Sequence, residues 1–164
     1  MSVLESFSLA GKRALVTGAS RGLGAAMAVA LAEAGADVAC ASSTAGGADE
    51  TARAIRALGR QAWPVHADLA DRDALKQMIA DVEQAASRID ILVNNGGSIA
   101  RAPAAAYPLD EWDRVLRTNL DSVWLLSQAF GRAMVERRAG KIVNVASLLS
   151  FSGGLTVPAY TASK

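Results

Sequence analysis

The residues best suited to proton chemistry are a tyrosine and a lysine four positions apart, Tyr160 and Lys164, in the segment VPAYTASK. In a helix, positions i and i+4 share one face and lie about 6 Å apart along the axis. A free phenol has a pKa of about 10, and a nearby cation favours its anionic form. Tyr160 can then give a proton to a carbonyl oxygen or take one from an alcohol. Such pairs are common on exposed helices, so the interpretation depends on the surrounding sequence.

Two further polar residues occupy positions that suit a site. Ser147 closes the β-rich run KIVNVAS, and α/β sheets place ligand-binding groups at the carboxyl ends of their strands. Its hydroxyl can donate a hydrogen bond to a substrate carbonyl oxygen. Asn119 lies inside a long helical stretch, although asparagine is a poor helix former. The simpler alternatives are a turn serine and an exposed helix asparagine.

A glycine-rich turn, TGASRGLG, spans residues 17–24. Gly18, Gly22 and Gly24 can allow a tight turn, backbone approach to a phosphate, and close packing of a helix on a sheet. The free N–H groups of the helix that follows form an anion site. Because a strand precedes the turn and a helix follows it, the turn predicts phosphate or dinucleotide binding rather than a purely structural bend.

Short β-rich runs alternate with longer Ala- and Leu-rich runs, which is typical of βαβ units around a parallel sheet. Pro64 places the third strand near an edge of that sheet. Strands are expected at residues 13–18, 36–42, 61–68, 89–95 and 141–147. Helices are expected at residues 22–35, 49–58, 71–86 and 109–140 and from about Tyr160 onward, with a loop at 148–159. Asp110 is a candidate N-cap, Asp71 or Asp73 supplies helix N-terminal charge, and Gly35 and Gly140 are candidate helix stops.

Composition limits the possible functions. The 164 residues suffice for one domain, and 51% hydrophobic residues exclude a disordered chain. Seventeen basic and sixteen acidic residues form no basic stripe, so neither nucleic acid nor a membrane is an expected partner. Cys40, the only cysteine, reads as a small buried hydrophobe. His66 has no clustered cysteine or carboxylate, so no metal site is expected, and the absence of a secretory signal or an apolar span predicts a cytoplasmic protein.

Taken together, these motifs resemble the short-chain dehydrogenase/reductase family over nearly the whole chain. In chain order they are Thr17-Gly18-x-x-x-Gly22-x-Gly24, ADL at 67–69, NNGG at 94–97, TNL at 118–120, Ser147 in NVAS, and Tyr160 and Lys164 in YTASK. Gly96 departs from the usual alanine, a small-for-small change. The resemblance implies a Rossmann-like doubly wound α/β fold. In this chain we expect five strands in the order 3-2-1-4-5, without the C-terminal strands and helices of the family. Residues 1–164 are therefore expected to form a single, incomplete domain.

The resemblance also implies roles for individual residues. Asn119, Ser147, Tyr160 and Lys164 are the implied catalytic set. Asn119 marks a helix kink and holds a water that relays protons, and Lys164 also holds ribose hydroxyls of the cofactor. Asp68 is expected to contact the adenine amine. The expected cofactor-binding residues are Gly18, Ser20, Arg21, Gly22, Leu23, Gly24, Ser42, Ser43, Asp68, Leu69, Asn95, Gly96, Tyr160 and Lys164.

The choice of nicotinamide cofactor depends on the end of the second strand. An acidic residue there selects NAD by binding the ribose 2′-hydroxyl, but this chain has Ser42 and Ser43. Arg21 is a cation close to the glycine turn, and in the family a basic residue there often accompanies NADP. We expect NADP, with NAD as the alternative and a solvated loop arginine as the simpler interpretation of Arg21.

The expected reaction is hydride transfer between a nicotinamide cofactor and a carbonyl/secondary alcohol pair. The segments FSLAGKRALVTGASRGLG and SFSGGLTVPAYTASK are most similar to gluconate and deoxygluconate dehydrogenases of the family, with 3-oxoacyl-carrier-protein reductases as the alternative. The family pattern continues beyond Lys164. We therefore also expect residues 1–164 alone to be unstable or aggregation-prone, with little or no turnover, as a fragment that at most binds nucleotide. If the chain is part of a longer protein, that parent is expected to form a tetramer or dimer.

Overall fold

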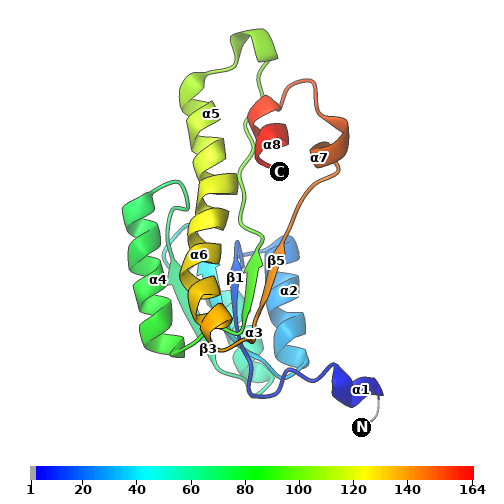
Figure 1. The fold of residues 1–164 in the computed structure, drawn as a ribbon, viewed down its shortest axis with the longest axis vertical. Coiled ribbons are helices and arrows are strands. Elements are labelled where there is room, and N and C mark those ends of the chain that lie inside the picture. Colours follow the sequence, from blue (N-terminus) through cyan, green and yellow to red (C-terminus); the bar gives the residue numbers. More distant parts are fainter. Residues whose placement is uncertain (1–2) are drawn as a thin grey trace.

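The computed structural model describes residues 3–164 and shows one α/β unit (Figure 1). Its strands are β1 (Arg13–Thr17), β2 (Asp37–Ser42), β3 (Ala62–His66), β4 (Ile91–Asn94) and β5 (Lys141–Asn144). Its helices are α1 (Val3–Ser6), α2 (Gly22–Glu33), α3 (Asp49–Ala57), α4 (Arg72–Ala86), α5 (Leu109–Leu116), α6 (Ser122–Glu136), α7 (Leu149–Ser152) and α8 (Pro158–Ser163), with a 3-10 turn at Ala104–Ala106 and a π-helical turn at Arg117–Asp121.

The five strands form one parallel sheet in the order β3-β2-β1-β4-β5, as predicted. β1 is central and pairs with β2 and β4, so its residues Ala14, Leu15 and Val16 are completely buried. β3 lies at one edge, which confirms the position predicted from Pro64. A proline costs least there, because it has no N–H to donate to a neighbouring strand. β5 forms the other edge.

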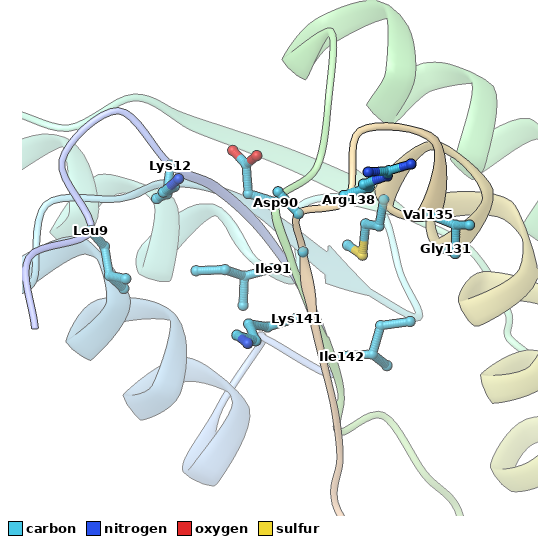
Figure 2. A pocket seen from close by; sticks show the side chains of 12 residues that line it. Leu9, Lys12, Asp90, Ile91, Gly131, Val135, Arg138, Lys141 and Ile142 are labelled. Atoms are coloured by element: carbon cyan, nitrogen blue, oxygen red, sulfur yellow. The ribbon is translucent and has the colours of Figure 1, made fainter.

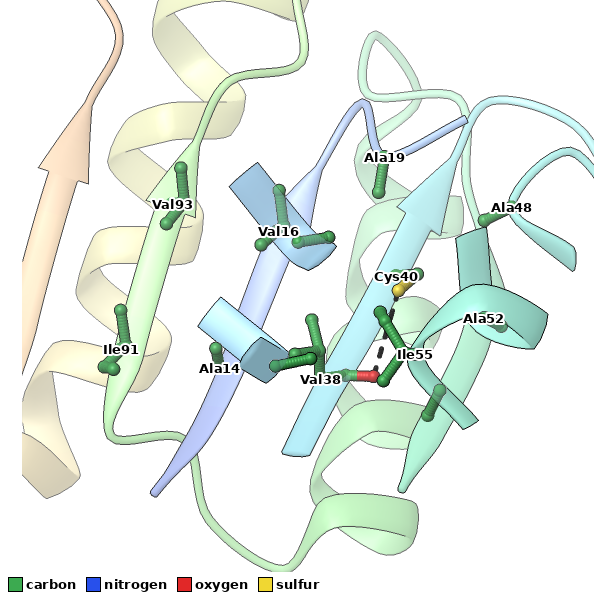
Figure 3. Packing of buried hydrophobic residues seen from close by; sticks show 13 residues of the cluster. Ala14, Val16, Ala19, Val38, Cys40, Ala48, Ala52, Ile55, Ile91 and Val93 are labelled. Carbon is green, nitrogen blue, oxygen red and sulfur yellow. Dashed lines mark hydrogen bonds between the residues drawn. The ribbon is translucent and has the colours of Figure 1, made fainter. Parts of the chain in front are cut away.

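Helices cover both faces of the sheet. On one face, small and branched side chains of the strands pack against α2 and α3, in the cluster drawn in Figure 3. Cys40 lies inside this cluster, where burial raises the pKa of its thiol to about 12, so it behaves as the small buried hydrophobe that was predicted. On the other face, Leu15 and Leu92 pack against α4 and α6 in a second cluster.

The prediction of one continuous helix over 109–140 is wrong, because the helix is interrupted and ends earlier than expected. It begins at Leu109 with Pro108 as the N-cap residue, so Asp110 is not the cap. The π turn interrupts it, and α6 ends at Glu136, before Gly140. Asp71 is confirmed as the N-cap of α4, since its carboxylate accepts the amides of Asp73 and Ala74.

The segment after β5 also differs from its prediction. It contains the short helix α7 within the expected loop, and α8 begins at Pro158 rather than near Tyr160. Proline suits the first turn of a helix, because its missing N–H would have no partner there. α8 packs against α5 and the π turn, high above the strand ends in Figure 1.

β5 is the least covered strand, with all four residues exposed. Beside it, a hollow of about 620 Å³ opens between the segment that leads into β1, the starts of β4 and β5, and the end of α6 (Figure 2). It is lined mainly by apolar side chains such as Leu9, Ile91 and Ile142. This hollow lies at the amino ends of the strands and holds none of the predicted site residues.

Within residues 3–164, no helix has the length and apolar character to cross a membrane.

Candidate active site

The glycine-rich turn joins β1 to α2 and takes a shape that requires glycine. Gly18 and Gly22 have positive φ values of 67° and 56°, which other residues rarely adopt. A Cβ on Gly24 would overlap the carbonyl oxygen of Gly18, so only glycine lets α2 approach the turn this closely. α2 begins at Gly22, and no side chain caps its N-terminus, so its first amides are available to an anion.

A hydroxyl at the end of β1 fixes this turn to the loop after β4. Thr17 Oγ1 accepts the backbone amides of Asn95 and Gly96 at 3.0 and 2.9 Å. The Asn95 side chain returns the contact, since Nδ2 donates to the carbonyl oxygens of Thr17 at 2.9 Å and Gly18 at 3.4 Å. Asn95 is a predicted cofactor-binding residue, and its side-chain nitrogen also holds the wall of the site through these two bonds.

These two segments form the walls of a cleft of about 400 Å³ at the carboxyl ends of the strands. Nine predicted cofactor-binding residues line it: Gly18, Ser20, Arg21, Ser42, Ser43, Asp68, Leu69, Asn95 and Gly96. Seven more were not predicted: Thr17, Ala41, Ala67, Gly97, Ser98, Arg114 and Thr118. The fold thus brings the segments after four strands, together with α5 and the π turn, to one cleft.

Asp68 and Leu69 form one end of the cleft with Gly96. The Asp68 carboxylate accepts the amide of Ala70 at 2.9 Å through Oδ1 and is otherwise exposed. A Cβ on Gly96 would lie 2.7 Å from Leu69 Cδ1 and 3.2 Å from Thr17 Oγ1. Gly96 therefore leaves room that the Leu69 side chain uses, and an alanine there requires that side chain to move.

The end of β2 presents hydroxyls rather than a carboxylate to the cleft. Ser42 is buried, and its Oγ donates to the carbonyl oxygen of Thr44 at 2.7 Å, whereas Ser43 is exposed. Arg21 lines the same cleft and is exposed. Among the described residues that line the cleft, Asp68 is the only carboxylate, so the corner formed by Arg21, Ser42 and Ser43 is free of negative charge.

The π turn directs Asn119 inward and buries it to 3% exposure. Its Oδ1 accepts the amide of Ser98 at 2.8 Å, and its Nδ2 donates to the Ser98 carbonyl at 2.9 Å and to Ser163 Oγ at 3.0 Å. The helix irregularity implied at Asn119 is thus present. The asparagine side chain connects the loop after β4, which lines the cleft, to α8.

The Tyr160–Lys164 pair adopts the predicted helical turn, since the Lys164 amide donates to the Tyr160 carbonyl at 3.0 Å. The half-buried Lys164 ammonium donates to the carbonyl oxygen of Val145 at 2.7 Å, at the end of β5. Burial lowers the pKa of Lys164 below its ordinary value. Lys164 Nζ and Asn119 Oδ1 both lie close to Gly97, where an added Cβ would meet them at 3.6 and 3.2 Å.

Ser147 lies three residues beyond β5, in the turn that leads to α7. Its Oγ accepts the amide of Leu149 at 3.2 Å, and its own amide donates to Ser150 Oγ at 3.1 Å. Since the Ser147 oxygen acts as an acceptor in this turn, its hydrogen is available to a substrate oxygen.

Asn119 and Lys164 thus lie together at one end of the site, whereas no direct contact joins Ser147 to Tyr160 among the described contacts. Gly22, Leu23 and Gly24 belong to the start of α2 and do not line the cleft.

Thr17 and Ser163 contribute hydrogen bonds to the site but were not among the predicted site residues. Within residues 3–164, no group of three or more His, Cys, Asp or Glu side chains is placed to hold a metal ion.

Comparison with known proteins agrees with this geometry. The family described as short chain dehydrogenase matches residues 12–164. The chain is 50% identical over 163 residues to 2-dehydro-3-deoxy-D-gluconate 5-dehydrogenase of Pseudoalteromonas atlantica, covering 99% of this chain and 64% of that protein. It therefore spans less than two thirds of the length of this curated relative.

Solved structures share the fold. A gluconate 5-dehydrogenase from Burkholderia cenocepacia, in complex with NADP and tartrate, has a TM-score of 0.90 and 39% identity, covering 99% of this chain and 64% of that one. A 3-oxoacyl (acyl-carrier-protein) reductase from Agrobacterium tumefaciens, with NADP bound, has a TM-score of 0.93 and 33% identity, covering 99% of this chain and 63% of that one.

Proposed function

The chain belongs to the short chain dehydrogenase family, and we propose that it supplies the cofactor-binding and catalytic half of an NADP-dependent oxidoreductase acting on the secondary alcohol or ketone of a sugar acid. The observation that carries this proposal is that Gly97, which lines the glycine-rich cleft, lies close to both Asn119 and Lys164. The cleft also suits a dinucleotide, because the uncapped N-terminus of α2 follows the Gly18 turn and its first amides are available to a pyrophosphate.

NADP, when bound, supplies or accepts the hydride of the reaction. The first amides of α2 and the backbone of the Gly18 turn hold its pyrophosphate. Arg21 attracts the 2′-phosphate, with the exposed hydroxyl of Ser43 as a further donor, while the Ser42 hydroxyl donates to the Thr44 carbonyl and shapes the loop. A carboxylate at this corner would repel the phosphate. Asp68 accepts from the adenine amine. NAD is the alternative, and Arg21→Ala tests the choice: comparable dissociation constants for NADP and NAD, unchanged by Arg21→Ala, would contradict the role of Arg21.

The chain's own residues move the proton. Ser147 donates its free hydroxyl hydrogen to the substrate oxygen and holds that oxygen toward Tyr160. The Tyr160 hydroxyl gives its proton to the carbonyl oxygen in reduction and takes the alcohol proton in oxidation. Lys164 places a positive charge one helical turn away and binds the ribose hydroxyls, while Asn119 holds a water that relays protons toward it. No metal ion takes part in this scheme.

The sugar-acid substrate is supported by the names of the relatives, whose matches span nearly all of this chain. Reduction of 3-oxoacyl thioesters is the alternative, supported by the fold shared with an acyl-carrier-protein reductase. A panel of keto-sugar acids and 3-ketoacyl thioesters, assayed through NADPH oxidation, separates the two. Activity on the thioesters alone would overturn the sugar-acid assignment.

A second candidate is nucleotide binding without turnover by residues 1–164 alone. It is favoured by the exposed strand β5 and by the share of the relatives that the chain spans, 64%. An uncovered sheet edge lowers stability and invites association with other chains. Purified residues 1–164 should then bind NADP and give little carbonyl-dependent NADPH oxidation, whereas normal turnover would refute this candidate.

Assembly and location follow the same family proposal. Leu120, Trp124 and Val135 are exposed on the π turn and α6, with 48%, 65% and 77% exposure. Large apolar side chains on one long helical stretch suit contact with a second copy, so the longer protein is proposed to form a cytoplasmic dimer or tetramer. Light scattering at several concentrations tests this, and a monomer at every concentration would contradict it.

A further inference from the structure

Ser163 connects two parts of the candidate site through one hydroxyl. The residue is buried, with 7% exposure. Asn119 Nδ2 donates to Ser163 Oγ at 3.0 Å, and that same hydroxyl donates to the carbonyl oxygen of Tyr160 at 3.0 Å. A hydroxyl can accept and donate at once, so both contacts hold simultaneously. The π turn is thereby joined to the turn that contains Tyr160 and Lys164.

The turn that Ser163 supports has little stability of its own. α8 has six residues, and isolated single helical turns are marginal in water. The Tyr160 carbonyl accepts from two donors, the Lys164 amide and Ser163 Oγ, both at 3.0 Å. The second donor is itself tied to a side chain that belongs to another helix.

The Asn119 end of this connection is held by further hydrogen bonds. Asn119 makes two further hydrogen bonds, both to the backbone of Ser98, at 2.8 and 2.9 Å. Ser98 lines the cleft and follows the loop that Thr17 holds in place. A continuous set of hydrogen bonds therefore runs from the cleft wall through Asn119 and Ser163 to Tyr160.

We propose that Ser163 is a positioning residue that holds the Tyr160–Lys164 turn in register with Asn119, a role that rests on the proposed oxidoreductase function. Its hydroxyl acts through its neighbours and does not contact the substrate. Without it, one Asn119 N–H loses its partner in a buried place, and the turn loses its only bond to that side chain among the described contacts. The reacting tyrosine and lysine then sample a wider range of placements.

A matched control separates this role from an ordinary helix serine. Ser122 is 1% exposed, and its Oγ donates to the carbonyl of Thr118 at 2.6 Å, so it makes the same kind of bond within a helix. That bond begins and ends in the same helical stretch. Ser122→Ala therefore removes a buried hydroxyl without separating Asn119 from α8.

The experiment compares Ser163→Ala, Ser163→Thr and Ser122→Ala in the protein at its full expressed length, with NADP and the best sugar-acid substrate. We expect Ser163→Ala to lower kcat about tenfold or more with the KM for NADP changed less than about twofold, since misplacement of reacting groups acts on the chemical step. Ser163→Thr keeps a hydroxyl that can bond the preceding turn, so we expect it to restore most of kcat. Unchanged kcat in Ser163→Ala, or an equal loss in Ser122→Ala, would overturn the proposal.

A second measurement keeps the two proposals separable. If the unmodified protein binds NADP but turns over none of the substrates, the oxidoreductase function fails, and the side-chain titration of Lys164 by NMR still tests Ser163. Burial lowers the pKa of Lys164, so a loosened turn in Ser163→Ala should raise that pKa toward its ordinary value. A titration identical to that of the unmodified protein would overturn the role of Ser163.

Discussion

The backbone amide of Gly96 donates to the hydroxyl oxygen of Thr17 at 2.9 Å, which joins the loop after β4 to the end of β1. The same oxygen accepts the amide of Asn95, and the Thr17 side chain is almost completely buried. The cleft walls thus depend on one hydroxyl that faces away from solvent. The glycine-rich turn and the loop after β4 can form a dinucleotide cleft only while the Thr17 hydroxyl holds them together.

Thr17→Val should therefore lower both stability and NADP affinity. The substitution keeps the shape of the side chain but leaves the buried Gly96 amide without its acceptor, at a cost of about 1–3 kcal/mol, while the Asn95 amide keeps only the Val93 carbonyl at 3.2 Å. Urea unfolding and NADP titration measure the two effects. Thr161→Val is the control, because Thr161 Oγ1 is buried without a hydrogen-bond partner among the described residues. Equal stability of the two variants would contradict the role of Thr17.

Gly24→Ala should abolish NADP binding. The added Cβ would overlap the Gly18 carbonyl oxygen and lie 2.6 Å from Asn95 Nδ2, and backbone atoms have little freedom to move aside. We expect destabilisation of about 1–3 kcal/mol as well, as for other overpacked sites. Gly131→Ala in α6 is the control. Its Cβ would meet only Ile142 Cδ1 at 3.7 Å, so helix propensity should make that variant about 0.5–1 kcal/mol more stable.

Gly96→Ala should be tolerated, in contrast to Gly24→Ala. The closest atom to its new Cβ is Leu69 Cδ1 at 2.7 Å, the far end of a flexible side chain that can rotate. We expect the dissociation constant for NADP to change less than about threefold, because the Thr17 contacts to the backbone at this loop are kept. A loss of affinity comparable to that of Gly24→Ala would show that the loop cannot adjust.

Stability should rise with pH at the alkaline end because of Lys164. Its pKa is lower in the folded protein, so the unfolded chain binds more protons between that lowered pKa and the ordinary value of 10.5. The free energy of unfolding of the unmodified protein, relative to Lys164→Gln, should therefore increase as pH rises through this interval. It should be constant well below the interval, where both states are protonated. A difference that falls with pH would contradict the burial of this ammonium.

The uncovered strand β5 should make residues 1–164 prone to self-association. Ile142 and Val143 are 39% and 48% exposed beside unpaired backbone groups, which form a template for another strand. Val143→Lys should reduce aggregation, measured by light scattering during concentration, because a charge at an edge strand opposes pairing. Aggregation that is unchanged in Val143→Lys would locate the cause elsewhere.

The sheet was predictable because each strand is a short apolar run bounded by turn residues, and Pro64 alone placed one of them at the edge. The π turn was not derivable from periodicity, because one extra residue in a helical turn shifts the pattern too little to be read in LRTNLDS. The family resemblance marked Asn119 as a kink, but it did not show which contacts the side chain makes.

The contributors that were missed have ordinary local sequence. Thr17 opens the glycine-turn motif but was assigned no role, and Ser163 reads as a small helix residue. The partners that give them their roles lie 78 to 79 and 44 positions away in the chain. Ser147 and Tyr160 were found from motifs, but the short helix α7, which lies between them in the chain, was not visible in the glycine-containing segment 148–159. Long-range hydrogen bonds are the part of the site that sequence patterns do not encode.

The most direct test of the proposed dinucleotide site is equilibrium titration of residues 1–164 with NADP and with NAD, monitored by tryptophan fluorescence or calorimetry. We expect saturable binding of one NADP per chain that is tighter than the binding of NAD, is weakened by Arg21→Ala and is lost in Gly24→Ala. If the folded protein binds neither dinucleotide, or binds both equally well in Gly24→Ala, the cleft is not a dinucleotide site and the proposed function is wrong.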